Sequence, residues 1–323
     1  MDLEPARDRV SGWTAEFPLR GPGGEPIDLR RVFVSHGLAA LPPMRFDPET
    51  ASFEITVPVG AGARTLSIGP GRPGHGLVRV AGPPPGRRIA VALMATVRTV
   101  LSLDQDLSPF YALAAKDPEL RWVVLGAGRM VRSPTVFEDV VKTICTTNTS
   151  WSGTTRMVNA LIEHLGVRAP GAPAGGPFGR AFPTAAAMAA VGLDFSRKVV
   201  GAGYRSAYLR DLASSVAGGA VDLEQLRRLS PEQVADDEIE ARLLALPGVG
   251  PYAAAHIMLM LGRHSRLILD SWTRPTYARL IGRSRPPADR TIERRFRRYE
   301  SYAGLAFWLF LTRDWVASPP DSI

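Results

Sequence analysis

The stretch Leu246–Tyr252, which reads Leu-Pro-Gly-Val-Gly-Pro-Tyr, constrains this chain more than any other. Upstream of it, residues 237–245 carry apolar side chains at helical spacing, which predicts a helix. Pro247 presets φ for a turn, and Gly248 supplies the positive φ that a type II turn needs at its next position. The sequence therefore predicts a helix that ends in a tight turn.

A second helix is expected directly after this turn. Gly250 can serve as its N-cap and Pro251 suits its first position, because a proline there gives up only an amide that the helix does not use. Gly262 is a stop signal. Together the two helices make a helix-hairpin-helix at residues 237–262.

The hairpin is a candidate phosphate site. The free backbone N–H groups of Gly248, Gly250 and Tyr252 would point outward at a helix N-terminus, which binds anions without a charged side chain. A Gly-x-Gly alone would favour an ordinary tight turn. The longer string, which continues through three alanines after Tyr252, is a more specific signal than Gly-x-Gly.

Composition fits a polyanionic partner. The formal net charge is +8 and the pI is about 10.1. A genome-wide bias toward arginine would give the same excess of positive charge. The sequence fits such a bias, because its basic residues are mostly arginines and its lysines are few. The N-terminal sequence has no apolar signal core, and the longest apolar run, Ile89 to Leu101, is broken by Arg98. We expect no membrane association, a cytoplasmic location and a monomer.

The periodicity predicts an α+β chain. Residues 31–80 alternate with period two, as antiparallel strands with one buried face do, and a Gly/Pro-rich stretch at 82–86 closes this region. From Arg87 onward the pattern is helical. We expect a helix that starts at Pro134 with Ser133 as its N-cap, helices over 118–125 and 154–165, and one after Arg205 with Tyr208 facing inward.

The hairpin and a later carboxylate, Asp270, resemble the helix-hairpin-helix DNA glycosylases with a Gly/Pro-Asp loop. The resemblance points to the 3-methyladenine (alkylpurine) and 8-oxoguanine DNA glycosylases, and segments 135–165, 201–216, 243–274 and 301–315 share it. It implies a small N-terminal antiparallel β-sheet domain and a mostly α-helical two-lobed body, with the active site in the cleft between the lobes. Cys145 is the single cysteine, which excludes the iron–sulfur branch.

The resemblance also implies a division of the chain and a partner. The expected units are a β domain at 1–86, a helical subdomain at 87–132 and 271–323, and a helical subdomain with the hairpin at 133–270. The partner would be double-stranded DNA that contains a damaged base.

Asp270 is the candidate catalytic residue. Cleavage of an N-glycosidic bond builds positive charge on the sugar, which an ionised carboxylate stabilises while it helps to activate water. Asp270 follows a short apolar run and precedes a helix, so a role as N-cap is the alternative, and the two roles are compatible. The preceding residue is Leu269 rather than the usual Gly or Pro.

Tyr252 bears on the reaction type. Bifunctional members of the family use a lysine nucleophile at the start of the second hairpin helix, where this chain has Tyr252. Catalysis through a Schiff base needs such an amine. The resemblance therefore implies a monofunctional enzyme that uses water.

Extrusion of a base leaves a gap in the duplex that side chains must fill. Gly-Ala-Gly-Tyr204-Arg205 resembles the motif of 8-oxoguanine glycosylases in which the Tyr wedges into the stack and the Arg reads the estranged base. Asn148 matches the Asn that fills the vacated space. The alternatives are a core aromatic for Tyr204 and a helix C-cap for Asn148. A further family Arg is missing here, where Trp151 to Gly153 lie.

The expected base pocket is aromatic. Phe307 stands where 8-oxoguanine enzymes carry a base-reading Gln, and His256 stands one turn into the second hairpin helix. Trp272 and Trp308 are near in sequence. Such a pocket favours flat or cationic bases, including alkylated purines. Adjacent helical residues diverge by about 100°, so one of Phe307 and Trp308 is expected in the core.

We expect no cofactor other than a structural monovalent cation, Na⁺ or K⁺, which the resemblance places on the backbone carbonyls of Leu244, Leu246 and Val249. Three functions remain open. They are a monofunctional glycosylase for damaged purines, an 8-oxoguanine glycosylase that tolerates loss of the lysine, and a DNA-binding hairpin protein without catalysis.

Overall fold

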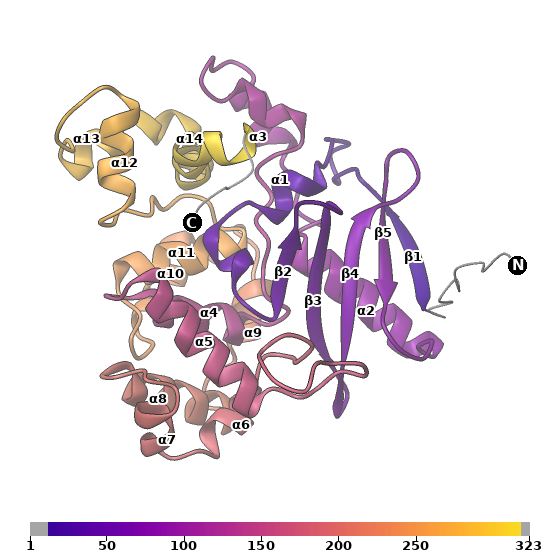
Figure 1. The fold of residues 1–323 in the computed structure, drawn as a ribbon. Coiled ribbons are helices and arrows are strands. Elements are labelled where there is room, and N and C mark those ends of the chain that lie inside the picture. Colours follow the sequence, from indigo (N-terminus) through magenta and orange to yellow (C-terminus); the bar gives the residue numbers. More distant parts are fainter. Residues whose placement is uncertain (1–11, 318–323) are drawn as a thin grey trace, which may run out of the picture.

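The computed structural model describes residues 12–317, and the outer ends of the expected segments 1–86 and 271–323 lie outside this range. A five-stranded sheet stands beside a helical body that is divided into two groups of helices (Figure 1). The α+β prediction is therefore confirmed. Within residues 12–317, no helix is both long and apolar enough to cross a membrane.

The sheet is antiparallel throughout, with strand order β1-β5-β4-β3-β2. Its strands are β1 (Trp13–Pro18), β2 (Met44–Asp47), β3 (Ser52–Val59), β4 (Gly62–Pro70) and β5 (His75–Val80). In β3, Phe53, Ile55 and Val57 are buried, as the alternating sequence predicts. The edge strand β1 lies outside the predicted range of 31–80, because it buries one side chain, Phe17, and so shows little periodicity.

Helix α2 (Arg87–Val100) covers the sheet. Leu93, Val97 and Val100 are buried in one core with the inner face of the strands. Short helices α1 (Leu29–Phe33) and η1 (Gly37–Ala40) connect the strands on this side. The proposed boundary at residue 86 would separate α2 from the sheet on which it packs, so the domain division stays a proposal.

The first group of helices forms a core around α4 (Val136–Thr146). It contains α5 (Trp151–Leu165), α6 (Ala185–Ala189), α7 (Leu193–Lys198), α8 (Arg205–Ala217), α9 (Leu223–Arg228), α10 (Asp236–Leu244) and α11 (Pro251–Leu261). Ten residues of α4 are buried, which makes this helix the centre of the group.

The second group packs around the C-terminal helix α14 (Ala303–Ala317). It contains α3 (Ser108–Ala114), η2 (Arg121–Leu125), α12 (Thr273–Leu280), α13 (Asp289–Phe296) and η3 (Arg297–Tyr302). Helix α11 contributes to both cores, with Ile257 in the first and Leu259 in the second. An all-round apolar helix such as α11 is expected to be buried on every side.

Three local predictions are corrected. Thr135, not Ser133, caps α4, because its Oγ1 accepts the Glu138 amide at 3.2 Å in the Thr-x-x-Glu pattern. Of the helix expected at 118–125, only the 3₁₀ helix η2 at Arg121–Leu125 forms. Tyr208 does not face inward. It is 39% exposed, because its ring lies on the surface of the hairpin turn at Gly248 rather than in the core.

Candidate active site

The hairpin has the predicted geometry. Helix α10 leads into a type II turn in which the Val249 amide donates to the Leu246 carbonyl at 3.2 Å, with Gly248 at φ +80°. Gly250 has an extended backbone and is the N-cap of α11, and Pro251 holds the first position. The prediction of a helix-hairpin-helix at 237–262 is confirmed.

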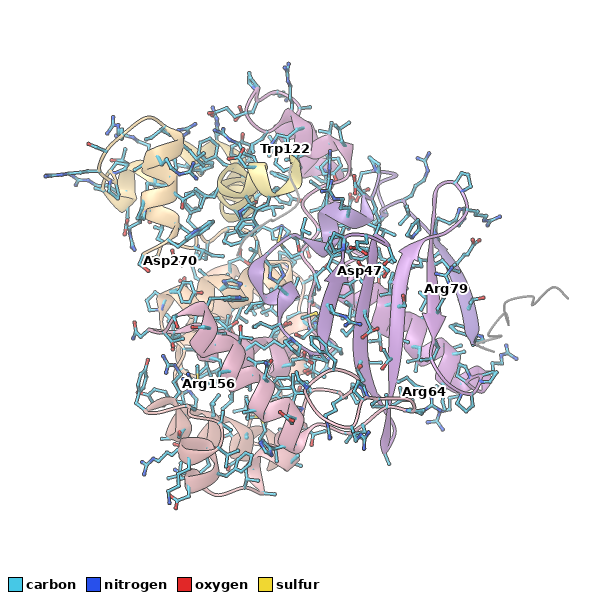
Figure 2. The ribbon with its side chains drawn as sticks, in the orientation of Figure 1. Asp47, Arg64, Arg79, Trp122, Arg156 and Asp270 are labelled. Atoms are coloured by element: carbon cyan, nitrogen blue, oxygen red, sulfur yellow. The ribbon has the colours of Figure 1, made fainter. Side chains whose placement is uncertain are left out.

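Asp270 accepts two backbone amides at the start of α12, just before its N-cap Trp272, and lines a cleft. Its Oδ1 accepts the backbone N–H groups of Trp272 and Thr273 at 2.8 and 2.6 Å, and its own N–H donates to Thr273 Oγ1 at 2.8 Å. No side chain or amide of the described residues donates to its second oxygen, Oδ2. Figure 2 shows Asp270 between the two groups of helices, on the side away from the sheet.

The cleft between the two groups has a volume of about 1450 Å³. Asp270, the hairpin turn and the expected wedge residues all line it. The lining comes from α4, α5, α8, α11, α12, α14 and η1, so it depends on the whole helical body. The structure thus brings most of the predicted site residues into one place.

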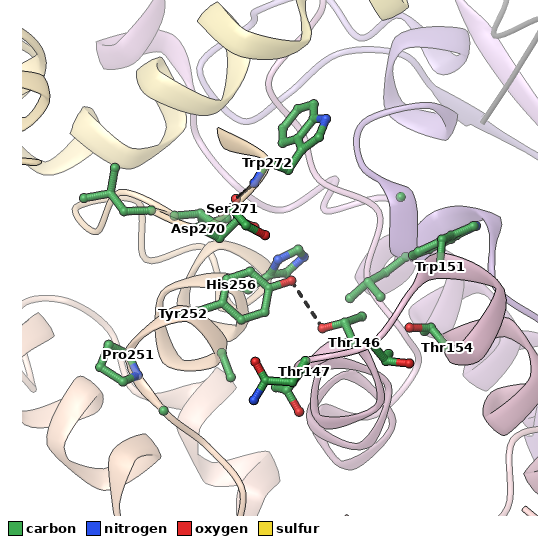
Figure 3. Close-up of a pocket in the computed structure, with 18 of the residues that line it drawn as sticks. Thr146, Thr147, Trp151, Thr154, Pro251, Tyr252, His256, Asp270, Ser271 and Trp272 are labelled. Carbon is green, nitrogen blue, oxygen red and sulfur yellow. Dashed lines mark hydrogen bonds between the residues drawn. The ribbon is translucent and has the colours of Figure 1, made fainter. Parts of the chain in front are cut away.

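Tyr252 lies on the cleft wall near Asp270 (Figure 3). Its hydroxyl is 3.2 Å from Thr146 Oγ1. Burial raises the pKa of the Tyr252 phenol, and the nearby Asp270 carboxylate adds to this effect, while the contact with Thr146 opposes it. Tyr252 is therefore a neutral hydrogen-bonding group at neutral pH.

Aromatic rings form the part of the cleft next to α14. Trp272 lies with its ring centroid 5.9 Å from Trp308 and 5.6 Å from Trp315. The Trp308 indole donates to the Ser35 carbonyl at 2.8 Å, which ties α14 to the chain beside the sheet. Trp272 is 40% exposed, so its ring is available for stacking.

The expectation that Phe307 lines the pocket is wrong. Phe307 is fully buried and packs on Phe296 and Tyr277, with ring centroids 5.3 and 6.0 Å away. It does not line the cleft, whereas the adjacent Trp308 does. The divergence of neighbouring side chains around a helix explains this difference.

His256 lies at the buried end of the cleft and is 6% exposed. Its ring is 6.0 Å from both His36 and Trp308, and 5.9 Å from Tyr252. Burial lowers the pKa of His256 to about 3, and His36 adds to this effect. The imidazole is therefore neutral at physiological pH.

Tyr204 and Asn148 meet at the outer edge of the cleft. Tyr204 is 54% exposed, which contradicts the alternative of a core aromatic, and Asn148 Nδ2 is 3.4 Å from its hydroxyl. Asn148 has φ +44° and directly follows Thr147, the C-cap of α4, so the C-cap alternative for Asn148 is wrong by one residue.

Arg205 differs from the expected reader of the estranged base. It is 6% exposed, and its guanidinium donates to the carbonyl and the hydroxyl of Thr147. Its guanidinium carbon also lies 4.5 Å from the centre of the Tyr204 ring. These hydrogen bonds satisfy the Thr147 carbonyl at the C-terminal end of α4 and hold the Arg205 side chain inside the protein. Arg205 therefore supports the Tyr204 ring and the turn at Asn148 from behind.

The carbonyls expected to hold a monovalent cation lie at the C-terminal end of α10, where the helix dipole favours cations. The Leu246 carbonyl accepts the Val249 amide, but no described backbone amide donates to the carbonyls of Leu244 and Val249. Two free carbonyl oxygens fit a cation ligand set. Within residues 12–317 no cluster of His, Cys, Asp and Glu could hold a metal ion.

Trp151 and Arg279 are among the cleft residues that the sequence did not predict. Trp151 begins α5 and packs near Gly37, on the wall opposite Asp270 (Figure 3). Arg279 lies one turn beyond Thr276 on α12, and both line the cleft. The signal for Trp151 was available, because tryptophan is large and rarely fully buried.

No protein-family model matches this chain, and no curated protein matches it in sequence. Solved structures do match. MBOgg1 in complex with a low-affinity DNA ligand has a TM-score of 0.69 at 17% identity, covering 97% of this chain and 99% of that one. The 8-oxoguanine glycosylase/lyase of Clostridium acetobutylicum has a TM-score of 0.66 at 19% identity, covering 89% and 93%.

The 3-methyladenine DNA glycosylase of Archaeoglobus fulgidus has a TM-score of 0.70 at 18% identity, covering 93% of this chain and 98% of that one. The chain therefore has the fold of the helix-hairpin-helix DNA glycosylases. Its structural neighbours are 3-methyladenine and 8-oxoguanine DNA glycosylases, the two groups that its sequence resembles.

Proposed function

We propose that this protein is a monofunctional DNA glycosylase that extrudes a damaged, alkylated purine and hydrolyses its N-glycosidic bond. The position of Asp270 carries this proposal. A carboxylate with one free oxygen faces an aromatic cleft next to a hairpin suited to phosphate. Among the solved neighbours are glycosylase structures in complex with DNA.

Asp270 acts on the sugar in this proposal. Two backbone amides hold Oδ1, so the carboxylate is fixed in place before substrate binds. Oδ2 then faces C1′, where it stabilises the developing oxocarbenium charge and orients the attacking water. No covalent intermediate with the protein is required.

The lining of the cleft supports a hydrolytic mechanism. None of the described residues that line it is a lysine, and Tyr252 occupies the position of the family's nucleophile. Its phenol has a raised pKa and stays protonated, so it is not a nucleophile at neutral pH. Schiff-base chemistry then has no amine in the site.

The aromatic wall supports an alkylated purine as substrate. Alkylation at a ring nitrogen makes the base electron-poor or cationic, and Trp272 and Trp308 offer rings for stacking and cation–π contact. The nearby His256 is neutral and so does not repel a cationic base. Among the described residues that line the cleft, the two aspartates Asp270 and Asp314 outnumber the one arginine, Arg279, which favours a cationic base.

The test is base release from duplexes under single-turnover conditions, with 3-methyladenine-type, hypoxanthine, 8-oxoguanine and ethenoadenine lesions. We expect release of an alkylpurine, with strand nicking only after hot alkali. Release of 8-oxoguanine alone would favour the alternative of an 8-oxoguanine glycosylase that tolerates loss of the lysine. DNA binding with no release from any duplex would favour a non-catalytic lesion binder.

Borohydride trapping separates the two catalytic mechanisms. A lyase forms a Schiff base with the abasic sugar, which borohydride reduces to a stable protein–DNA adduct. We expect no adduct from this protein under conditions in which it releases base. A covalent adduct would contradict the monofunctional mechanism.

A further inference from the structure

The segment 271–300, which contains α12, α13 and most of η3, concentrates positive charge. It holds nine arginines against three acidic residues, a formal net charge of +6. The rest of the chain holds 30 of the 39 basic residues and 28 of the 31 acidic ones, a net charge of +2. A genome-wide bias toward arginine would spread its excess over the whole chain, so it does not explain this segment.

Most of these arginines have no acidic partner. Three form ion pairs with nearby carboxylates: Arg274 with Asp289, Arg295 with Glu119, and Arg298 with Asp117. Among the described residues, no carboxylate pairs with the other six, which are all exposed: Arg279, Arg283, Arg285, Arg290, Arg294 and Arg297. Like charges that gather on one surface repel one another, so this cluster favours an anionic partner.

Two of the unpaired arginines line a groove between α12 and α13. The groove has a volume of about 410 Å³, and Arg283, Arg294 and the hydroxyl-bearing Thr291 are among its lining residues. None of the described residues that line it is acidic. A guanidinium offers five N–H donors in a fork that matches phosphate oxygens, so the groove suits a phosphate group.

This basic surface begins at the cleft. Arg279 lines the cleft, and Arg283, four residues further along the chain, lines the groove. A Schellman turn at Gly282 (φ +70°) holds Arg283 against the end of α12, where the Arg283 amide donates to the Ala278 carbonyl at 2.8 Å. Helices α12 and α13 lie on the side of the molecule away from the sheet (Figure 1), as Asp270 does (Figure 2).

We propose that the six unpaired arginines form a second DNA contact, which binds the phosphate backbone of the duplex beside the extruded base. The inference rests on the proposed function, because it takes duplex DNA as the partner. Phosphates repeat about every 3.4 Å along each strand. A duplex whose damaged base enters the cleft therefore has further phosphates within reach of a surface that starts at the cleft wall.

The two DNA contacts differ in chemistry. The hairpin turn offers backbone N–H groups without a charged side chain, whereas the surface on α12 and α13 offers guanidinium groups. Contacts from arginine to phosphate carry no sequence information, so this surface adds affinity and orientation without selecting a base. An acidic protein segment would also match the charge, but the continuity with the cleft favours DNA.

The first test removes two charges from the groove. Arg283→Gln/Arg294→Gln is compared with Arg79→Gln/Arg88→Gln, which removes two exposed arginines from the sheet and the start of α2. Figure 2 shows Arg79 far from Asp270. The ligand is a duplex with a tetrahydrofuran abasic analogue, and its binding constant is measured against salt concentration. Each lost phosphate contact lowers the slope of log K against log salt by about 0.9, so we expect the groove variant to lose about 1.8 and the control none.

The second test locates the DNA directly. Cys145 is the single cysteine of the chain and is buried, so a cysteine introduced at the surface takes a photocrosslinker alone. We expect Arg294→Cys to crosslink to the strand beside the abasic site, and Arg79→Cys to give no crosslink.

Three results would overturn the proposal. They are a wild-type salt slope in the groove variant, which would leave an acidic protein segment as the partner, an equal loss of slope in the control, and no crosslink from Arg294→Cys. If the slope falls and the crosslink forms but no base is released from any duplex, the proposed hydrolysis fails and the second contact stands. Base release with an unchanged slope would support the hydrolysis and overturn the contact.

Discussion

At the scale of single residues, the catalytic role proposed for Asp270 is compatible with the structural role that its hydrogen bonds show. Oδ1 closes the first turn of α12 through the amides of Trp272 and Thr273. Oδ2 stays free for the sugar. The cap fixes the carboxylate, which is a form of preorganisation that hydrolysis of the glycosidic bond requires.

These two roles separate in a pair of variants. Asp270→Asn keeps an oxygen for the cap, so its thermal stability should stay close to the wild type. Asp270→Ala loses the cap and should be destabilised by about 1 kcal/mol. Thermal unfolding of the three proteins measures the difference. Equal destabilisation by Asn and Ala would show that the charge, not the cap, stabilises α12.

At the scale of elements, the hairpin turn depends on two glycines for different reasons. Gly248 has φ +80°, and a Cβ there would lie 2.9 Å from the Tyr208 ring. Gly250 has an ordinary negative φ, and a Cβ there would meet open space. The first glycine serves the fold, and the second leaves room for a close ligand.

The two alanine variants should therefore differ. Gly248→Ala should lower the free energy of unfolding by more than about 1 kcal/mol, because it combines a strained φ with a clash. Gly250→Ala should fold nearly as the wild type but bind duplex DNA more weakly, since its methyl group would occupy the open space beside the proposed phosphate site. Urea unfolding and fluorescence anisotropy measure the two effects. Wild-type affinity in Gly250→Ala would argue against a phosphate at this turn.

The sequence predicted the elements whose signals are local. The turn at Pro247 and Gly248 and the cap at Asp270 follow from backbone chemistry that a few residues specify. It failed where tertiary packing decides. Phe307 is buried because the far side of α14 meets α13, and Arg205 turns inward because α4 ends beside it. Trp151 joins the cleft through a contact with Gly37, which is distant in sequence.

At the scale of the whole molecule, three buried histidines link folding to pH. Burial lowers the pKa of His36 to about 4 and those of His256 and His264 to about 3, from 6.5. In the unfolded chain these rings bind protons below pH 6.5, whereas in the folded protein they stay neutral. Stability from this source is thus fully present above pH 6.5 and falls as the pH drops toward the folded values.

His256→Phe removes one of these rings and gives the test. Its stability relative to the wild type should improve below pH 6.5 by about 1.4 kcal/mol per pH unit. Buried carboxyls with raised pKa values, Glu138 and Asp139, are common to both proteins and cancel in the difference. Urea unfolding between pH 4.5 and 7.5 measures it. A difference that does not vary with pH would show that folding leaves the pKa of His256 unchanged.

The proposed role of Asp270 is tested by comparing the wild type with Asp270→Asn on one duplex from which the wild type releases the damaged base. We expect Asp270→Asn to bind the duplex with wild-type affinity and to keep the fold, because the cap survives. Its single-turnover rate of base release should fall by at least about 100-fold. Base release by Asp270→Asn at a rate close to that of the wild type would contradict the catalytic role of Asp270.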